Sequence, residues 1–288
     1  MVRFGPDRGR VAGAEREPAA KAALLSRINA ERRAAGVPPL KYDLFAARVG
    51  DAFCLDAAVT GVSGHWDLAG RAPYLRWALA GGVDYHAENA CSYSRIGGGF
   101  REDEASSLLL QAHGRMMAER PPDDGHRQTV LDPLWTHVGI GFAAAGGEVR
   151  MTEEYSRRLA EWVEMPASPL PPGSVAPFAM RLPAGWNVGV IEVAFERFPK
   201  PLTAAETRRR GSYGYPPFVR RLVPRLEPGF TYAGGRKGDF DVVSGVVRAG
   251  IPLSRGPGHY FVLAFAGPGE ASGRRLSPIT GALITAAP

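Results

Sequence analysis

The chain has 288 residues, of which 45% are hydrophobic and 22% charged, which is the composition of a globular protein and not of a disordered one. A chain of this length fits two domains. No run of residues reaches the ~20 apolar positions of a membrane-spanning helix. The chain has two cysteines and no Cys-x-x-Cys pair, which excludes a four-thiolate zinc site. The formal net charge of +6 favours anionic partners, but the basic clusters lack interleaved aromatic residues, so we expect no nucleic-acid binding.

The first half of the chain is predicted to be mainly helical. A proline in the first turn and a glycine after the end mark a helix over residues 18–35. An aspartate, Asp43, can cap a second helix over residues 44–60, which a glycine follows. A short helix is predicted over residues 73–80. Acidic residues that favour a helix N-terminus begin a longer helix over residues 102–120.

Strand patterns follow from residue 138 onward. Residues 138–144 and 148–155 predict two strands, and the Gly-Gly pair between them is a hairpin signal. Residues 166–177 contain five prolines and are predicted to form a linker. Short strand-like runs separated by Gly and Pro come after it, at residues 188–195, 240–247, 260–266 and 281–285.

These patterns predict an α+β chain in two domains. Short strands at this spacing are typical of a β-sandwich, and we expect an immunoglobulin-like one. Thr203 and Glu206 form a capping box for a short helix within it. The expected divisions are a flexible tail at residues 1–16, a first domain at 17–165, the linker at 166–177 and a β-sandwich accessory domain at 178–288.

The first domain contains a scattered set of ionisable residues instead of a compact catalytic motif. The sequence has no His-Glu-x-x-His, no Gly-x-Ser-x-Gly and no P-loop. Two histidines, His65 and His126, and two glutamates, Glu88 and Glu119, remain as candidates. Residues of these types can hold a divalent ion such as zinc while leaving coordination positions open for water.

The other histidines and the cysteines have weaker signals. His86 is interpreted as a surface residue or a further ligand, His137 as the structural start of a strand, and His113 and His259 as surface or packing residues. In a secreted protein the two cysteines, Cys54 and Cys91, would bridge, whereas in the cytoplasm they would be two buried thiols.

A family resemblance is carried by segments that occur in a fixed order over residues 22–155. They are, in chain order, Leu25–Arg32 with Gly36–Leu40, Gly64–Asp67 with Gly70–Arg71, Pro73–Tyr74 and Arg76, Glu88–Asn89, Gly125–Arg127 with Val130–Leu131 and His137–Gly141, and Thr152–Tyr155. Together they resemble the CAP superfamily, which includes cysteine-rich secretory proteins, antigen 5 and plant pathogenesis-related proteins. The compact bacterial SCP-like members are especially similar.

The resemblance implies a fold and a site. The fold would be a three-layer α-β-α sandwich with an open cleft. The cleft would carry a metal-binding set at the matching positions, His65, Glu88, Glu119 and His126. The family pattern is broken at three places, where Ala87 replaces the glycine of Gly-Glu-Asn, Met116 replaces a tryptophan and Glu153 replaces a glutamine.

Three functions remain open at this point. The first is a secreted binding module for a lipid, a sterol-like molecule or a cell-envelope ligand. The second is a zinc-dependent hydrolase or protease in which Glu88 or Glu119 acts as general base. The third is a protein–protein interaction module in which the two histidines and two glutamates are structural. The resemblance implies an extracellular or periplasmic location, although residues 1–16 carry no apolar leader.

Overall fold

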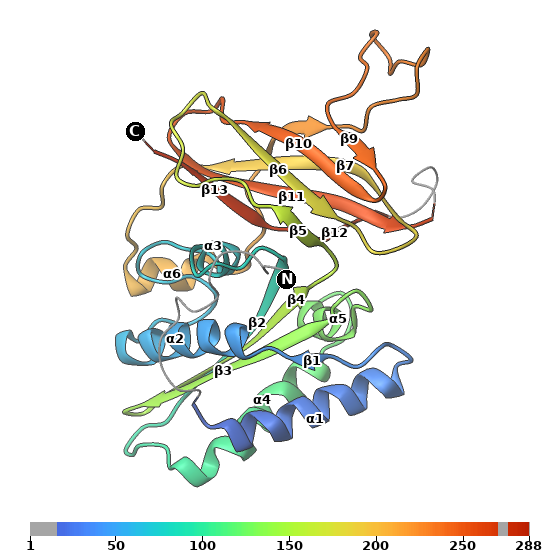
Figure 1. Cartoon of the computed structure of the whole chain (residues 1–288). Helices are drawn as coiled ribbons and strands as arrows, with labels where there is room; N and C mark the ends of the chain where they lie inside the picture. The colour runs from blue at the N-terminus through green and yellow to red at the C-terminus, as the bar shows by residue number, and fades with distance from the viewer. Residues whose placement is uncertain (1–15, 270–275, 288) are drawn as a thin grey trace.

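The computed structural model describes residues 16–269 and 276–287, so nearly all of the tail predicted at residues 1–16 lies outside the described residues. Residues 16–157, called the first domain below, combine helices with one sheet (Figure 1). The helices are α1 (Pro18–Ala34), α2 (Leu44–Thr60), α3 (Pro73–Leu79), the 3-10 turn η1 (Glu102–Glu104), α4 (Ala105–Met117) and α5 (Gly125–Leu131). The strands are β1 (Lys41–Tyr42), β2 (Tyr85–Ser94), β3 (His137–Ala145) and β4 (Glu148–Arg157), in the order β1-β3-β4-β2.

The sheet of the first domain lies between two layers of helices (Figure 1). On one face α2 approaches so closely that a Cβ on Gly139 of β3 would lie 2.1 Å from the backbone nitrogen of Ala47, so only glycine is accommodated there. The other face packs against α1 and α4 in a core that includes Leu24, Leu109 and Ile140. This is the α+β class, with the three-layer α-β-α arrangement, that the sequence predicted.

Local capping chemistry sets the ends of α2 where the sequence predicted them. The Asp43 side chain accepts the N–H of Phe45 at 3.1 Å, and Gly61 follows the helix with a φ of 70°. The fourth predicted helix is shorter than residues 102–120, because η1 precedes α4 and α4 ends at Met117. Glu119 therefore lies beyond the helix, in the segment that leads to α5.

Residues 161–287, called the sandwich domain below, form two sheets. One sheet contains β5 (Glu161–Glu164), β6 (Val175–Arg181), β10 (Val246–Pro252) and β9 (Asp241–Val243) in that order. The other contains β12 (Ser277–Pro278), β11 (Gly258–Pro268), β7 (Trp186–Glu196) and β8 (Phe218–Leu222), with β13 (Ala282–Ala286) paired to β11 and α6 (Ala204–Arg210) between β7 and β8 in sequence. Their common core includes Phe178 from one sheet and Val193 and Tyr260 from the other. The two sheets pack as a β-sandwich, and its immunoglobulin-like character stays a prediction.

The proline-rich segment at residues 166–177 is tied into the sandwich instead of running free. Leu170 donates its N–H to the carbonyl of Thr285 at 3.0 Å, and residues 175–177 belong to β6. The preceding strand β5 already pairs with β6, so the change from one domain to the next falls between residues 157 and 161, ahead of the predicted residue 165. Proline has no backbone N–H to donate, but the other residues of the segment have one and can form these hydrogen bonds.

The sandwich domain is docked on the first domain through an apolar contact. The main chains also meet, since Tyr85 donates its N–H to Ile279 at 3.2 Å and Gly281 donates its N–H to Val83 at 3.0 Å. The buried side chains at the contact are Ala72, Tyr74, Leu75 and Ala78 from α3 and its start, and Ala194, Phe261 and Leu263 from the sandwich.

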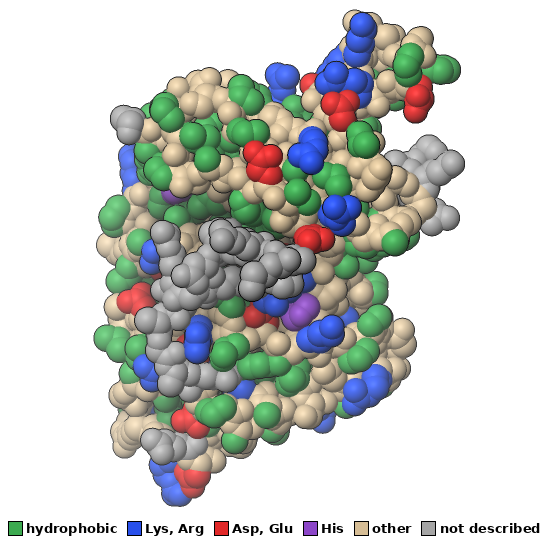
Figure 2. Space-filling view, in the orientation of Figure 1, with side chains coloured by type: hydrophobic (Ala, Val, Ile, Leu, Met, Phe, Trp, Pro, Cys, Tyr) green, Lys and Arg blue, Asp and Glu red, His purple; other side chains and the backbone are tan. Residues whose placement is uncertain are grey.

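Two surface properties bear on possible partners. Lys and Arg side chains lie among other residue types on the face drawn in Figure 2, and several gather on the loop between β8 and β9 that projects from the sandwich. Arg225 on this loop pairs with Asp241, and Arg236 pairs with Asp239. Among residues 16–269 and 276–287, no helix is long and apolar enough to cross a bilayer.

Candidate functional site

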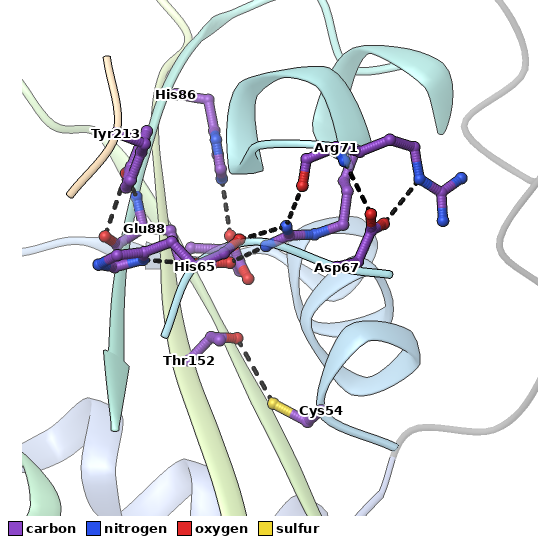
Figure 3. A network of polar contacts seen from close by, with 10 residues as sticks. Cys54, His65, Asp67, Arg71, His86, Glu88, Thr152 and Tyr213 are labelled. Atoms are coloured by element: carbon purple, nitrogen blue, oxygen red, sulfur yellow. Dashed lines mark hydrogen bonds and ion pairs between the residues drawn. The ribbon is translucent and has the colours of Figure 1, made fainter. Parts of the chain in front are cut away.

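The first candidate pair joins His65 to Glu88. Glu88 lies in β2, and His65 lies in the loop between α2 and α3 (Figure 3). The Nδ1 atom of His65 is 2.8 Å from Oε1 of Glu88, and Arg76 of α3 donates from Nη2 to the other carboxylate oxygen at 2.5 Å. Both oxygens of this buried glutamate are therefore occupied.

A second carboxyl lies directly across the sheet from Glu88. Glu154 of β4 is its cross-strand partner and accepts a hydrogen bond from Nε2 of His86 at 2.7 Å. The His86 ring stacks on Trp77, with 4.6 Å between ring centroids. Burial raises the pKa of both carboxyl groups and lowers the pKa of His86 to about 3, so His86 stays neutral. The interpretation of His86 as a surface residue is wrong, because its ring is enclosed between α3 and the sheet.

The second candidate pair joins His126 to Glu119 and is more exposed. The Nδ1 atom of His126 is 2.5 Å from Oε1 of Glu119, whose Oε2 accepts the backbone N–H of His126 at 3.1 Å. The two side chains keep 35% and 24% of their surface accessible. Asn89, the next residue after Glu88, donates to the carbonyl of His126 at 3.1 Å. Because successive strand residues point to opposite faces, Glu88 serves the α3 side of β2 and Asn89 the α5 side.

The four predicted metal ligands thus form two His–Glu pairs. Among the residues that the structure describes, no group of three or more His, Cys, Asp or Glu is arranged to hold a metal ion. In each pair the glutamate carboxylate contacts Nδ1 of the histidine. A carboxylate in this position orients an imidazole that binds a metal through its other nitrogen, and is not itself a ligand of the metal. The side chains do not fit a four-ligand centre, but they leave Nε2 of His65 and of His126 without a hydrogen bond to any described residue.

The sequence analysis missed a buried ion network centred on His113. This fully buried side chain lies 2.7 Å from Oε1 of Glu153 through Nδ1 and 2.7 Å from Oε2 of Glu31 through Nε2. Burial disfavours the imidazolium, but the two carboxylates outweigh it and raise the pKa of His113. Burial would also raise the pKa of Glu153, yet His113, Tyr155 and Asn89 together lower it.

A signal for this network is present in the sequence. His113 follows Leu109 by four residues and precedes Met116 by three, so it shares the apolar face of α4. A histidine on such a face needs a polar partner, and Glu31 follows Ile28 of α1 by three residues. The interpretation of His113 as a surface or packing residue is corrected to that of a buried charged bridge between α1, α4 and β4.

A cleft of about 610 Å³ lies between α1, α4 and α5. Its wall includes Glu31, the outer member of the His113 network, which also accepts from Nε of Arg27 at 2.5 Å. Arg120 and Arg127 border it, and they directly follow Glu119 and His126 in the sequence. The lining residues are Arg27, Glu31, Ala34, Ala35, Gly114, Met117, Ala118, Arg120, Arg127 and Leu131.

The two cysteines do not form the bridge that a secreted location predicted. Both are free thiols, Cys54 buried in α2 and Cys91 half-buried in β2. The Sγ atom of Cys54 lies 3.8 Å from the hydroxyl oxygen of Thr152 (Figure 3). Burial raises the pKa of each thiol, which disfavours the reactive thiolate.

The chain was compared with protein-family models, curated protein sequences and solved structures, and matches were found among the solved structures. No protein-family model and no curated protein sequence matches the chain. The matching structures include an outer surface protein of Borrelia burgdorferi, with 12% identity over 49% of this chain and 94% of that one, and a TM-score of 0.39. An extracellular protein of Bacillus anthracis that contains a SCP domain matches with 17% identity over 49% of this chain and 41% of that one, and a TM-score of 0.38.

A third match is the structure of NaASP2 with Zn2+, at 13% identity over 50% of this chain and 82% of that one, with a TM-score of 0.38. Each match covers about half of the present chain. The chain is therefore similar over about half its length to solved structures that include a SCP-domain protein, the class that its sequence motifs resemble.

Proposed function

We propose that this CAP-type chain is a binding module, and that it takes an anionic amphiphile in the cleft between α1, α4 and α5. The observation that carries the proposal is the lining of this cleft, in which three arginines border an apolar surface. Its volume of about 610 Å³ lies within the range of small-molecule sites.

Charge in the cleft favours a negatively charged head group. Glu31 is its single carboxylate among the lining residues, and it is already engaged by Arg27 and by the imidazolium of His113. Arg127 has no ion pair among the described residues, and Arg120 donates to backbone carbonyls of the preceding residues alone. Guanidinium groups bind carboxylates and phosphates with two parallel hydrogen bonds. Met117 and Leu131 would contact the apolar tail.

The test of this proposal is a binding titration with a fluorescent fatty acid and with vesicles of anionic phospholipid. We expect Arg120→Glu and Arg127→Glu each to weaken binding of the fatty acid roughly tenfold or more, since a charge-assisted hydrogen bond contributes about 1.5–3 kcal/mol. Arg225→Glu on the distant β8–β9 loop is the matched control and should change little. Unchanged affinity in the cleft variants, or no binding by the unaltered chain, would remove the proposal.

We also propose that each of the two histidines can offer its free Nε2 atom to a divalent cation such as Zn2+, at two separate positions. What supports it is the pairing of each Nδ1 with a glutamate, which fixes the ring and directs the free lone pair to Nε2. A bound cation would supply a Lewis acid. A hydrolase that uses Glu88 as general base is less favoured, because His65 and Arg76 occupy both of its oxygens.

Calorimetric titration of Zn2+ into metal-free protein tests the second proposal. We expect Zn2+ binding that a His65→Ala/His126→Ala double variant loses, while His259→Ala, a histidine of the sandwich domain, keeps it. Equal binding by the double variant would contradict the proposal. If neither fatty acid nor metal binds, the alternative of a protein–protein interaction module with structural His–Glu pairs gains weight.

We propose an extracellular or periplasmic location on the basis of the family resemblance. Recovery of the unprocessed chain, with Met1 intact, from the cytosolic fraction of the native cell would contradict it.

A further inference from the structure

The loop between β8 and β9, residues 223–240, is a defined projection of the sandwich domain (Figure 1). Backbone hydrogen bonds join its two arms, because Leu226 donates its N–H to the carbonyl of Lys237 at 3.2 Å. Farther along, Tyr232 donates its N–H to the carbonyl of Arg236 at 2.8 Å, and its hydroxyl donates to the carbonyl of Pro224 at 2.9 Å. The loop therefore has a shape of its own, although it extends away from the rest of the sandwich.

An aromatic side chain lies exposed in the outer part of this loop. Phe230 lies between the two residues that the Leu226–Lys237 bond joins, and its N–H donates to the carbonyl of Glu227 at 3.1 Å, which closes a turn. The side chain of Phe230 keeps 70% of its surface accessible, whereas Phe240, at the base of the same loop, keeps 1%. Phe240 thus anchors the loop in the core, while the ring of Phe230 gains apolar burial when a partner covers it.

Positive charge accompanies this ring. Residues 220–241 contain five Lys and Arg but three Asp and Glu, which is an excess of two positive charges. Arg225 and Arg236 of the loop are each paired with an aspartate. Lys237 is exposed, and among the described residues no acidic side chain pairs with it. Basic and hydrophobic side chains lie close together on the projection (Figure 2), so its outer part is both cationic and apolar.

A projection of this composition fits a flat anionic surface. A small molecule needs a concave site, whereas this loop is convex. At the surface of a bilayer, aromatic rings lie at the boundary between head groups and acyl chains, and lysine side chains are attracted to anionic lipids. The two properties that the loop combines are therefore those that such a surface binds.

From these observations we propose that the β8–β9 loop docks the chain on an anionic phospholipid bilayer. Phe230 inserts at the head-group boundary, and Lys237 contacts the lipid phosphates. One aromatic ring and a small charge excess make the docking reversible and sensitive to salt. The loop shares no residue with the cleft between α1, α4 and α5, so this surface is distinct from the proposed ligand site.

The experiment is sedimentation of the full chain with vesicles of phosphatidylcholine, prepared with and without phosphatidylglycerol. The variants are Phe230→Ser and Lys237→Glu. Two controls lie on the first domain, where Ile96→Ser removes a fully exposed apolar side chain and Arg101→Glu makes the same charge change at an arginine with 76% of its side chain exposed. The melting temperature of each variant checks that it folds.

We expect the unaltered chain to bind the vesicles that contain phosphatidylglycerol, to bind phosphatidylcholine alone more weakly, and to be released by high salt. Phe230→Ser should weaken binding roughly tenfold and Lys237→Glu roughly fivefold, while the controls should change it less than about twofold. Fatty-acid affinity should be the same in all four variants, which separates this proposal from that for the cleft.

Three results would overturn the proposal. They are equal binding to the two kinds of vesicle, equal losses in the loop variants and their controls, and no sedimentation of the unaltered chain with either vesicle. The last result would leave another protein as the partner of the exposed ring.

Discussion

Replacing His113 with leucine is expected to lower the free energy of unfolding by about 3–5 kcal/mol near pH 6. The substitution leaves the carboxylates of Glu31 and Glu153 without the cation between them, and the side chain of Glu153 is fully buried. Tyr155 and Asn89 would still donate to Glu153, but they bring no charge. Urea denaturation followed by circular dichroism measures the loss.

The pH dependence of this loss follows from the two pKa shifts. The folded protein raises the pKa of His113 above its ordinary 6.5, so its ionic contribution is complete below 6.5 and disappears as the pH rises through the raised value. The folded protein also lowers the pKa of Glu153 below its ordinary 4.5. The contribution of the ionised Glu153 to stability is therefore complete above pH 4.5 and disappears as the pH falls through the lowered value. The difference between wild type and His113→Leu should therefore be largest between about pH 4.5 and 6.5.

The control for this prediction is His126→Leu. It removes a histidine that also pairs with a glutamate, but at a partly exposed position, and should cost less than about 1 kcal/mol. Equal losses in the two variants, or a His113→Leu loss that does not vary with pH, would contradict the assignment of a buried imidazolium.

Features set by neighbouring residues could be predicted from the sequence. The cap at Asp43, the glycine after α2 and the capping box of Thr203 and Glu206 each depend on residues within four positions of one another, and the structure contains all three. The hairpin of β3 and β4 was predicted for the same reason, since two strand-like runs meet at the Gly146–Gly147 pair.

Features that depend on distant residues could not be predicted in the same way. His113 meets Glu31 and Glu153 across 82 and 40 residues, and nothing close to it in sequence identifies them. In the sandwich domain, residues 240–247 were predicted as one strand, but β9 and β10 are separated by a turn in which Ser244 has a φ of 51°. A serine–glycine turn with positive φ is a weaker hairpin signal than asparagine–glycine.

The candidate site falls between these two cases. The motifs identified the histidines and glutamates, but not which of them contact each other, because this depends on the face of β2 on which each lies. Nor could the sequence relate the hydroxyl of Tyr213 to the backbone carbonyl of Glu88, to which it donates, because the two residues are 125 positions apart and belong to different domains. Arg76, the residue that donates to Glu88, was visible in the sequence only as part of the family segment that also contains His65.

Replacing Arg76 with methionine is expected to lower the free energy of unfolding by about 3–5 kcal/mol at pH 7. The guanidinium donates to Glu88 and to the carbonyl of His65 at 2.6 Å, and it lies 3.7 Å from the ring centroid of Phe53. Methionine keeps the apolar contact and loses the charge. Glu88 then lies opposite Glu154 with no arginine between them, and neutral His86 supplies no positive charge.

The stability lost in Arg76→Met should increase as the pH rises. An ordinary salt-bridged glutamate, whose pKa is lowered, contributes stability that is instead lost as the pH falls. Burial already raises the pKa of Glu88 and Glu154 above 4.5, and removal of Arg76 raises the pKa of Glu88 further. A carboxyl with a raised folded pKa is favourable below 4.5 and becomes unfavourable as the pH rises through the folded value. Arg76→Met should therefore be closer to wild type at pH 5 than at pH 8, as denaturation at the two pH values would measure.

A double-mutant cycle separates the charge effect from a packing effect. If the lost stability is that of an uncompensated carboxylate, Glu88→Gln in the Arg76→Met background should recover part of it, with a coupling energy of about 1–3 kcal/mol. Arg181→Met is the matched control, because Arg181 pairs with Glu161 at 3.6 Å with about half of its side chain exposed and should cost less than about 1 kcal/mol. Additive losses in the cycle would mean that Arg76 acts through Phe53 and the loop carbonyls, and that Glu88 is already protonated in the folded protein.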